Sequence, residues 1–183
     1  DTFLKKASGL GHELRCYEDT IAFVAQIRDR ARRAERIEEA CRRRYPGVRI
    51  ARLDGDVIRR DRKEAFRILD ELKHGRIDIL IGTQMIAKGL DEPRVTLAAV
   101  VLADVGLHMP DFRSTERTFQ ILSQMIGRSG RHTPGRAVIQ SFQPGCAAVT
   151  CSLNEDLERF YSAELDTRRA GGWPPFSRVF RIV

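Results

Sequence analysis

Two arginines and two glycines lie close together at the end of the stretch from Gln120 to Arg131, whose sequence is QILSQMIGRSGR. The planar guanidinium groups of Arg128 and Arg131 suit phosphate oxygens, with which they form paired hydrogen bonds. Gly127 and Gly130 carry no side chain where the backbone would have to approach a ligand. These residue types and their spacing predict an anion site. An amphipathic helix with a glycine cap and two solvated arginines explains the same stretch equally well.

The residues just before these arginines have the periodicity of an amphipathic helix. Phe119, Leu122 and Ile126 recur at helical spacing and would bury one face. Gln124 and Arg128 are four residues apart, so a helix would place them side by side on another face. We therefore expect Gln124 to lie next to the anion site.

A second stretch with suitable chemistry runs from Gly82 to Asp91, with the sequence GTQMIAKGLD. Thr83 would place a hydroxyl at a helix start, where free backbone N–H groups favour a phosphate. A turn with Lys88, Gly89 and Asp91 follows. Taken singly, such a threonine is more often a helix cap and such an aspartate more often a turn residue.

Helix and strand patterns alternate along the chain and would position these two stretches. Helices are expected over residues 19–27, over 33–45 with Pro46 and Gly47 as its end, and up to Gly75 with Ala65, Phe66, Leu69 and Leu72 buried. Two more helices are expected around Gln120 and over residues 146–169. Strands are expected over residues 48–53, 77–81, 95–103 and 136–142.

This alternation predicts an α/β fold with a parallel sheet flanked by helices. In such sheets ligands bind beyond the carboxyl ends of the strands. We therefore expect the site in the loops after Ile81, Ala103 and Phe142, together with the turn that ends the helix around Gln120.

Composition limits the class of protein. A length of 183 residues suits one well-packed domain with tails, and a formal charge of +7 favours a polyanionic partner. The four cysteines form no C-x-x-C pair and fit neither a zinc ribbon nor a disulfide framework, so we expect a reduced, cytoplasmic protein without a metal site. No run of eighteen apolar residues occurs, so no membrane insertion is expected.

Taken together, the two stretches resemble the second RecA-like lobe of a superfamily 2 helicase. Residues 82–91 resemble its motif V, and residues 124–131 resemble its motif VI, Q-x-x-G-R-x-G-R. Four further segments are similar to the PriA family of bacterial primosomal, or replication-restart, helicases: residues 53–56, 104–108, 111–117 and 174–177. The resemblance covers roughly residues 33–183.

This resemblance implies an ATP-dependent DNA helicase whose second lobe closes on ATP and Mg²⁺. Arg128 and Arg131 would reach the γ-phosphate as arginine fingers, and Gln124 would connect that site to the moving lobe. Asp91 would lie near the ribose. The glycines expected to border the nucleotide are Gly89 and Gly127.

The resemblance also implies single-stranded or forked DNA as a partner. Thr83 and Gln84 would touch the phosphate backbone, which a motor contacts because it must step along any sequence. Primosome proteins and single-strand-binding proteins would be further partners.

The chain departs from the family in three ways. These 183 residues contain neither a phosphate loop nor an acidic magnesium motif, so we expect the first lobe to be absent and the chain alone to be inactive. The zinc-binding cysteines of the family are missing. Residues 1–33 match poorly, which leaves open whether the lobe has its own first strand.

We therefore expect three parts: residues 1–33 as a poorly matched segment, 34–145 as the RecA-like lobe, and 146–183 as a helix and the start of a truncated C-terminal domain. In that last part, a helix and one strand packed on the lobe, with Trp173 in the core, remains an alternative. Two other functions also remain open: a non-catalytic RecA-like module that binds nucleic acid or a partner, and a degenerate product without activity.

Overall fold

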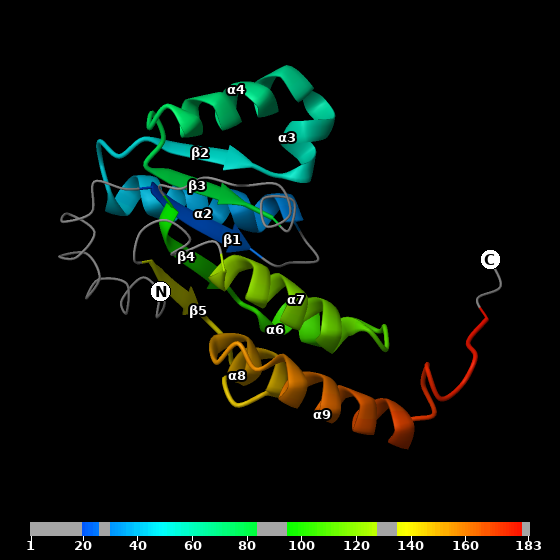
Figure 1. Cartoon of the computed structure of the whole chain (residues 1–183). Helices are drawn as coiled ribbons and strands as arrows, with labels where there is room; N and C mark the ends of the chain where they lie inside the picture. Colours follow the sequence, from blue (N-terminus) through cyan, green and yellow to red (C-terminus); the bar gives the residue numbers. More distant parts are fainter. Residues whose placement is uncertain (1–19, 26–29, 84–94, 128–134, 181–183) are drawn as a thin grey trace.

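A computed structural model describes residues 20–25, 30–83, 95–127 and 135–180, with side chains from Ala34 onward. Within these ranges, five strands form one parallel sheet in the order β2-β3-β1-β4-β5 (Figure 1). The strands are β1 (Thr20–Ala25), β2 (Ile50–Leu53), β3 (Ile79–Gly82), β4 (Val95–Val101) and β5 (Arg136–Ile139). The predicted RecA-like parallel sheet is confirmed.

Helices cover both faces of this sheet. The helix α2 (Arg30–Arg44) lies on one face, and α4 (Arg62–Lys73) and α7 (Ser114–Ile126) lie on the other. Two short helices, α3 (Gly55–Arg60) and α6 (Asp104–Leu107), follow β2 and β4. Beyond β5, α8 (Ala147–Leu153) packs on α7, and α9 (Leu157–Ala170) follows (Figure 1).

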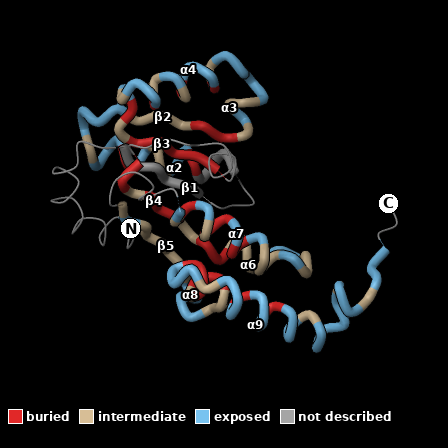
Figure 2. Tube along the Cα trace, viewed as in Figure 1, coloured by how far each residue is buried: buried red, intermediate tan, exposed pale blue. Residues whose placement is uncertain are grey.

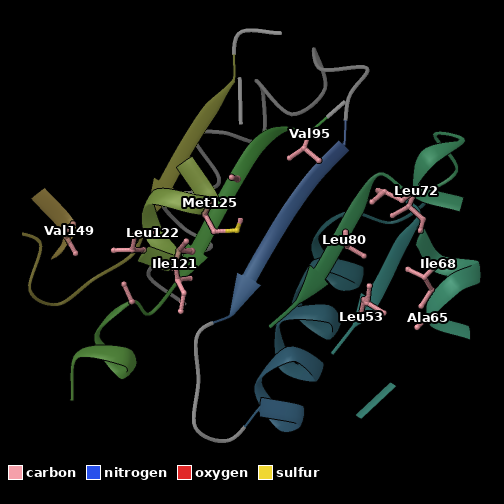
Figure 3. Packing of buried hydrophobic residues seen from close by; sticks show 14 residues of the cluster. Leu53, Ala65, Ile68, Leu72, Leu80, Val95, Ile121, Leu122, Met125 and Val149 are labelled. Atoms are coloured by element: carbon pink, nitrogen blue, oxygen red, sulfur yellow. The ribbon is translucent and has the colours of Figure 1, made fainter. Parts of the chain in front are cut away.

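Alternation along the strands builds two apolar layers, because successive side chains point to opposite faces. On the α2 side, Ile79, Ile81 and Ala99 pack against Ala34 and Cys41. The other layer joins the sheet to α4, α7 and α8 (Figures 2 and 3), and its members include Leu53, Ile68, Leu72, Leu80, Ala98, Val100, Leu122, Met125 and Val149. These layers hold the strand ends in fixed positions.

The sequence predicted a helix over residues 19–27, and this was wrong for residues 20–25, the described part, where the structure has a strand. The strand β1 pairs with β3 on one side and with β4 on the other. The lobe therefore has its own first strand, which lies in the middle of the sheet. A short apolar run cannot be assigned to strand or helix from periodicity alone, which explains the error.

The predicted helix over residues 146–169 is in fact two helices. Asn154 caps the end of α8, Glu155 has a positive φ of 55°, and the Asp156 carboxylate accepts a hydrogen bond from the N–H of Arg159 at 3.0 Å. A left-handed residue followed by an aspartate cap ends one helix and starts the next. Of the expected tail, residues 171–180 contain no strand, and Trp173 is 44% exposed.

The helix expected to end at Gly75 is confirmed. Gly75 has a φ of 67° and its N–H donates to the Leu72 carbonyl, while the N–H of Arg76 donates to the Glu71 carbonyl. This is the Schellman arrangement, in which a left-handed glycine satisfies the last carbonyls of a helix. The buried face differs from the prediction, however. It contains Ile68, whereas Phe66 is 68% exposed.

Candidate functional site at the two edges of the sheet

All five strands are parallel, so their carboxyl ends share one edge of the sheet (Figure 1). Ligands of open α/β sheets bind at this edge. The residues that follow the strands there are Asp54 after β2, Thr83 after β3, Leu102 to Asp104 after β4, and Gln140 to Phe142 after β5. This edge therefore contains three of the predicted loops.

Thr83 is the described member of the predicted DNA contacts. It follows Gly82 directly at the end of β3, and only 4% of its surface is exposed. Gln84 lies outside the described residues. A phosphate contact at Thr83 stays a prediction, and it would have to use the small part of the side chain that reaches the surface.

Asp54 is a helix cap at this edge. Its Oδ1 accepts hydrogen bonds from the N–H groups of Asp56 and Val57, both at 2.9 Å, and so starts α3. Its Oδ2 is 3.4 Å from Nε of Arg52. The carboxylate therefore has a structural role, since it caps α3 and lies close to Arg52.

Asp104 connects the ends of two neighbouring strands, a role that the sequence analysis missed. Its carboxylate accepts hydrogen bonds from the Ser141 hydroxyl at 2.8 Å, the Phe142 N–H at 2.9 Å and the Gln143 N–H at 3.0 Å. Burial raises the pKa of Asp104, but these hydrogen bonds outweigh burial, so its pKa lies below the ordinary value. The only sequence signal is an aspartate close behind an apolar strand.

A cavity of about 370 Å³ opens beside this carboxylate. It is lined by Leu102, Asp104, Val105, His108, Met109 and Phe142. The side-chain amide nitrogen of Gln143 lies 3.3 Å from Nε2 of His108, within hydrogen-bonding distance. The cavity therefore has mostly apolar walls, with the imidazole of His108 as a polar group in the lining.

The turn that ends α7 lies at the opposite, amino edge of the sheet. The helix starts after the carboxyl end of β4 and runs back along the sheet, so that its last turn lies toward the amino ends of the strands (Figure 1). The expectation that this turn shares an edge with the loop at Thr83 was wrong. A helix that joins two parallel strands must run antiparallel to them, and this rule fixes where it ends.

The buried face of α7 largely agrees with the prediction. Phe119 and Leu122 are buried and Ile126 is partly buried, while Gln124 is exposed as expected. Gly127 is not in a left-handed conformation, since its φ is −66°. A Cβ there would lie 3.3 Å from the Ser123 carbonyl oxygen. The backbone conformation therefore does not require a glycine at this position.

Several predicted site residues fall outside the part of the chain that the structure describes. They are Gln84, Gly89, Asp91, Arg128 and Arg131. Of the predicted site, the described residues are Thr83 at the carboxyl edge and Gln124 and Gly127 at the amino edge. Among these described residues, Thr83 therefore lies at the opposite edge of the sheet from Gln124 and Gly127.

Among the described residues, no group of three or more histidine, cysteine or acidic side chains is placed to hold a metal ion. Burial raises the pKa of Cys41 to about 11, with a smaller contribution from the nearby Glu38, so this thiol stays protonated at neutral pH.

No helix in the described ranges is long and apolar enough to cross a bilayer.

A sequence profile described as the helicase conserved C-terminal domain matches residues 5–133. The chain belongs to this helicase family. The match begins well before residue 33, in agreement with the central place of β1 in the sheet.

Curated relatives define the helicase type more closely. The Replication restart protein PriA of Bacillus subtilis is 45% identical over 144 residues, which are 78% of this chain and 18% of that protein. The PriA of Treponema pallidum is 43% identical over 150 residues (81% of this chain, 22% of that protein), and that of Thermotoga maritima is 34% identical over 183 residues (100% and 25%). The chain spans a quarter or less of the length of these relatives. It is a superfamily 2 helicase C-terminal lobe close in sequence to PriA.

Solved structures agree on the fold of this helicase lobe. Mycobacterium smegmatis helicase Lhr, solved with single-stranded DNA and AMP-PNP, aligns with a TM-score of 0.53 and 22% identity over 85% of this chain and 20% of that chain. The Pyrococcus furiosus Hef helicase domain gives a TM-score of 0.50 and 22% identity, covering 87% and 27%. At these identities the similarity shows the fold alone.

Proposed function

We propose that this lobe is the second half of an ATP-dependent DNA helicase of the replication-restart type. In this proposal Arg128 and Arg131 act as arginine fingers on ATP, and Thr83 and Gln84 contact the backbone of single-stranded or forked DNA. The observation that carries the proposal is 43% and 45% identity to two PriA proteins across a region that retains the Q-x-x-G-R-x-G-R sequence. Cytoplasmic location and primosome partners belong to the same proposal.

The amino edge suits the nucleotide because of how α7 is anchored. Phe119, Leu122 and Met125 are buried, so the last turn of α7 has a fixed position, and Gln124 projects from it into solvent. The carboxyl end of a helix carries partial negative charge, which alone disfavours a phosphate. The positive charge would therefore have to come from the arginines that follow Gly127 in the sequence.

ATP with Mg²⁺ between two lobes would supply the phosphoryl group that is transferred to water. The residues of this lobe would act on charge: guanidinium groups stabilise the negative charge that builds on the transferred group. A glycine at 127 admits close approach of a ligand to an exposed backbone, which fits the absence of a conformational need for glycine there.

The carboxyl edge suits a polyanion. Near it, where α3 follows β2 and meets α4, four exposed basic residues occur in five positions: Arg59, Arg60, Arg62 and Lys63. Arg59 forms an ion pair with Asp56, which leaves a net positive charge in this segment. Basic side chains of this kind provide the sequence-independent, salt-sensitive part of DNA binding.

The test places Arg131→Ala in a chain that also carries a phosphate-loop lobe. DNA-stimulated ATP hydrolysis should fall by about 10³-fold or more, whereas the thermal unfolding midpoint should not change. Arg67→Ala is the matched control, because Arg67 is exposed on α4 and forms an ion pair with Glu64, one turn earlier on the same helix. That variant should keep full turnover.

Unchanged ATP hydrolysis in Arg131→Ala would contradict the arginine-finger role. If the unmutated two-lobe chain bound single-stranded DNA in a salt-sensitive manner but hydrolysed no ATP, the lobe would be a non-catalytic nucleic-acid-binding module.

A further inference from the structure

The Phe142 side chain is 83% exposed although its backbone is firmly held. It lies just beyond the end of β5, and its N–H donates to the buried carboxylate of Asp104. The N–H of Gln140 donates to the Val100 carbonyl at 2.9 Å, which continues the pairing of β4 and β5 to this point. The exposed ring is therefore displayed by an ordered turn. Met109, which is 41% exposed, lines the same cavity, so the ring belongs to a larger apolar surface, and such surfaces indicate an interaction site.

The cavity beside Phe142 has a second unusual feature. Leu102, which contributes to its wall, has a φ of 60°. Residues other than glycine rarely adopt this left-handed conformation. Strain of this kind persists where the surroundings enforce it and is concentrated at functional sites. Here the N–H of the next residue, Ala103, donates to the Gln140 carbonyl at 2.9 Å, so the bond between the two strand ends fixes the strained turn.

The chemistry of the cavity suits a flat aromatic group with polar edges. Val105 and Met109 supply apolar walls, and His108 adds an imidazole to the lining, whose Nε2 lies 3.3 Å from the side-chain amide nitrogen of Gln143. The one carboxylate in the lining, Asp104, is 5% exposed and already accepts three hydrogen bonds, so it is shielded from an approaching polyanion.

We propose that Phe142 and this cavity hold one unpaired base of single-stranded DNA, a proposal that rests on the proposed DNA contact at Thr83. Both residues follow strands at the same edge, and β3 and β5 are three strand positions apart, or about 14 Å. A single strand of DNA can therefore contact both Thr83 and Phe142. Every base has an aromatic face, so stacking on Phe142 tolerates any sequence.

Two oligonucleotides of equal length and charge test this proposal on the 183-residue chain. One is oligo-dT labelled with a fluorophore, and the other has the same backbone with abasic sites in place of the bases. Fluorescence anisotropy should show tighter binding of oligo-dT. Phe142→Ala should weaken oligo-dT binding about ten-fold, leave abasic binding unchanged and so remove the difference.

Two variants serve as controls. Phe142→Tyr should keep the preference for oligo-dT, because a tyrosine ring stacks equally well. Phe66→Ala removes another exposed phenylalanine, 68% exposed on the outer face of α4, and should change neither affinity. The thermal unfolding midpoint of each variant shows whether folding is preserved.

Equal binding of both oligonucleotides by the unmutated chain, with Phe142→Ala unchanged, would overturn base stacking and leave the backbone contact intact. Equal loss of affinity for both oligonucleotides in Phe142→Ala would also overturn it. Failure of the unmutated chain to bind either one would overturn the proposed DNA contact, and base stacking with it.

Discussion

Asp104 and Phe142 are 38 residues apart in the chain, yet the carboxylate of the first accepts a hydrogen bond from the backbone N–H of the second at 2.9 Å. Asp104 is the first residue of α6, which follows β4, and Phe142 follows β5. The contact joins the carboxyl ends of two adjacent strands at the edge where we propose that DNA binds. Hydrogen bonds to an ionised group in a buried position are among the stronger ones in proteins.

Asp104→Asn should lower the free energy of unfolding by about 2 kcal/mol at pH 7, because an amide offers one acceptor oxygen to donors arranged around a carboxylate. Urea unfolding followed by circular dichroism measures this change. Asp166→Asn is the control, since Asp166 is exposed and pairs with Arg169; it should change stability by less than about 0.5 kcal/mol.

The cost of Asp104→Asn should also depend on pH. The pKa of Asp104 is lowered from 3.8 in the folded state, so its ionised form stabilises the fold fully above pH 3.8, and this stabilisation is lost as the pH falls through the folded-state pKa. Unfolding at pH 7, 5 and 3 should give a large difference between the unmutated chain and the variant at the first two values and a smaller one at pH 3. A difference that stays constant down to pH 3 would contradict the assigned hydrogen bonds.

The sheet was predictable because its signals are local and redundant. The apolar runs at β3 and β4 are buried on both faces, and Gly75 ends α4 with the left-handed turn that glycine favours. The strand β1 was missed for the opposite reason. A six-residue apolar segment acquires strand structure from its neighbours β3 and β4, and its own pattern does not contain that information.

The candidate site was only partly predictable, because motifs give residue types and not their positions in space. The sequence gives no sign that Thr83 is almost wholly buried or that Phe142 is displayed to solvent. The prediction from the sequence also placed the end of α7 at the wrong edge of the sheet. The direction of a connecting helix follows from the topology, so the error was avoidable once a parallel sheet had been predicted.

Arg168→Ala should lower the free energy of unfolding by about 3 kcal/mol. Arg168 donates to Glu164 at 2.9 Å and to Glu116 of α7 at 2.8 Å, so its loss leaves a nearly buried carboxylate unpaired and releases the end of α9 from α7. Its guanidinium also lies 5.2 Å from the centre of the Phe112 ring.

The neighbouring Arg169 provides the control for that change. Arg169 is exposed and pairs with Asp166, so Arg169→Ala should cost less than about 1 kcal/mol. Urea unfolding compares the two variants under the same conditions. Equal losses in both would show that the contacts of Arg168 contribute nothing specific.

Gly75→Ala should lower stability, whereas Gly127→Ala should mainly lower turnover. Gly75 has a φ of 67°, so an added Cβ should cost about 1–2 kcal/mol, whereas Gly127 has a φ of −66°, so alanine there should change stability by less than about 0.5 kcal/mol. In a chain with a phosphate-loop lobe, Gly127→Ala should still reduce ATP hydrolysis by about 10²-fold, because the side chain would displace the nucleotide. Full turnover in this variant would remove Gly127 from the proposed nucleotide site.

Thr83→Val should weaken binding of single-stranded DNA about five-fold, because valine keeps the shape of threonine and removes the hydroxyl proposed to bond a phosphate. Threonine carries no charge, so the slope of log affinity against log salt concentration should not change. Thr96→Val is the matched control. Thr96 is a buried threonine near the start of β4, at the opposite edge, and its hydroxyl has no hydrogen-bond partner among the described residues.

Because Thr96→Val removes an unpaired buried polar group, it should leave DNA affinity unchanged and should not lower stability. Anisotropy titrations at three salt concentrations, with urea unfolding of both variants, separate the two threonines. If Thr83→Val bound DNA as tightly as the unmutated chain at every salt concentration, the strand would not contact this hydroxyl. The exposed basic residues of α3 and α4 and the ring of Phe142 would then be the remaining described candidates for DNA contact at the carboxyl edge.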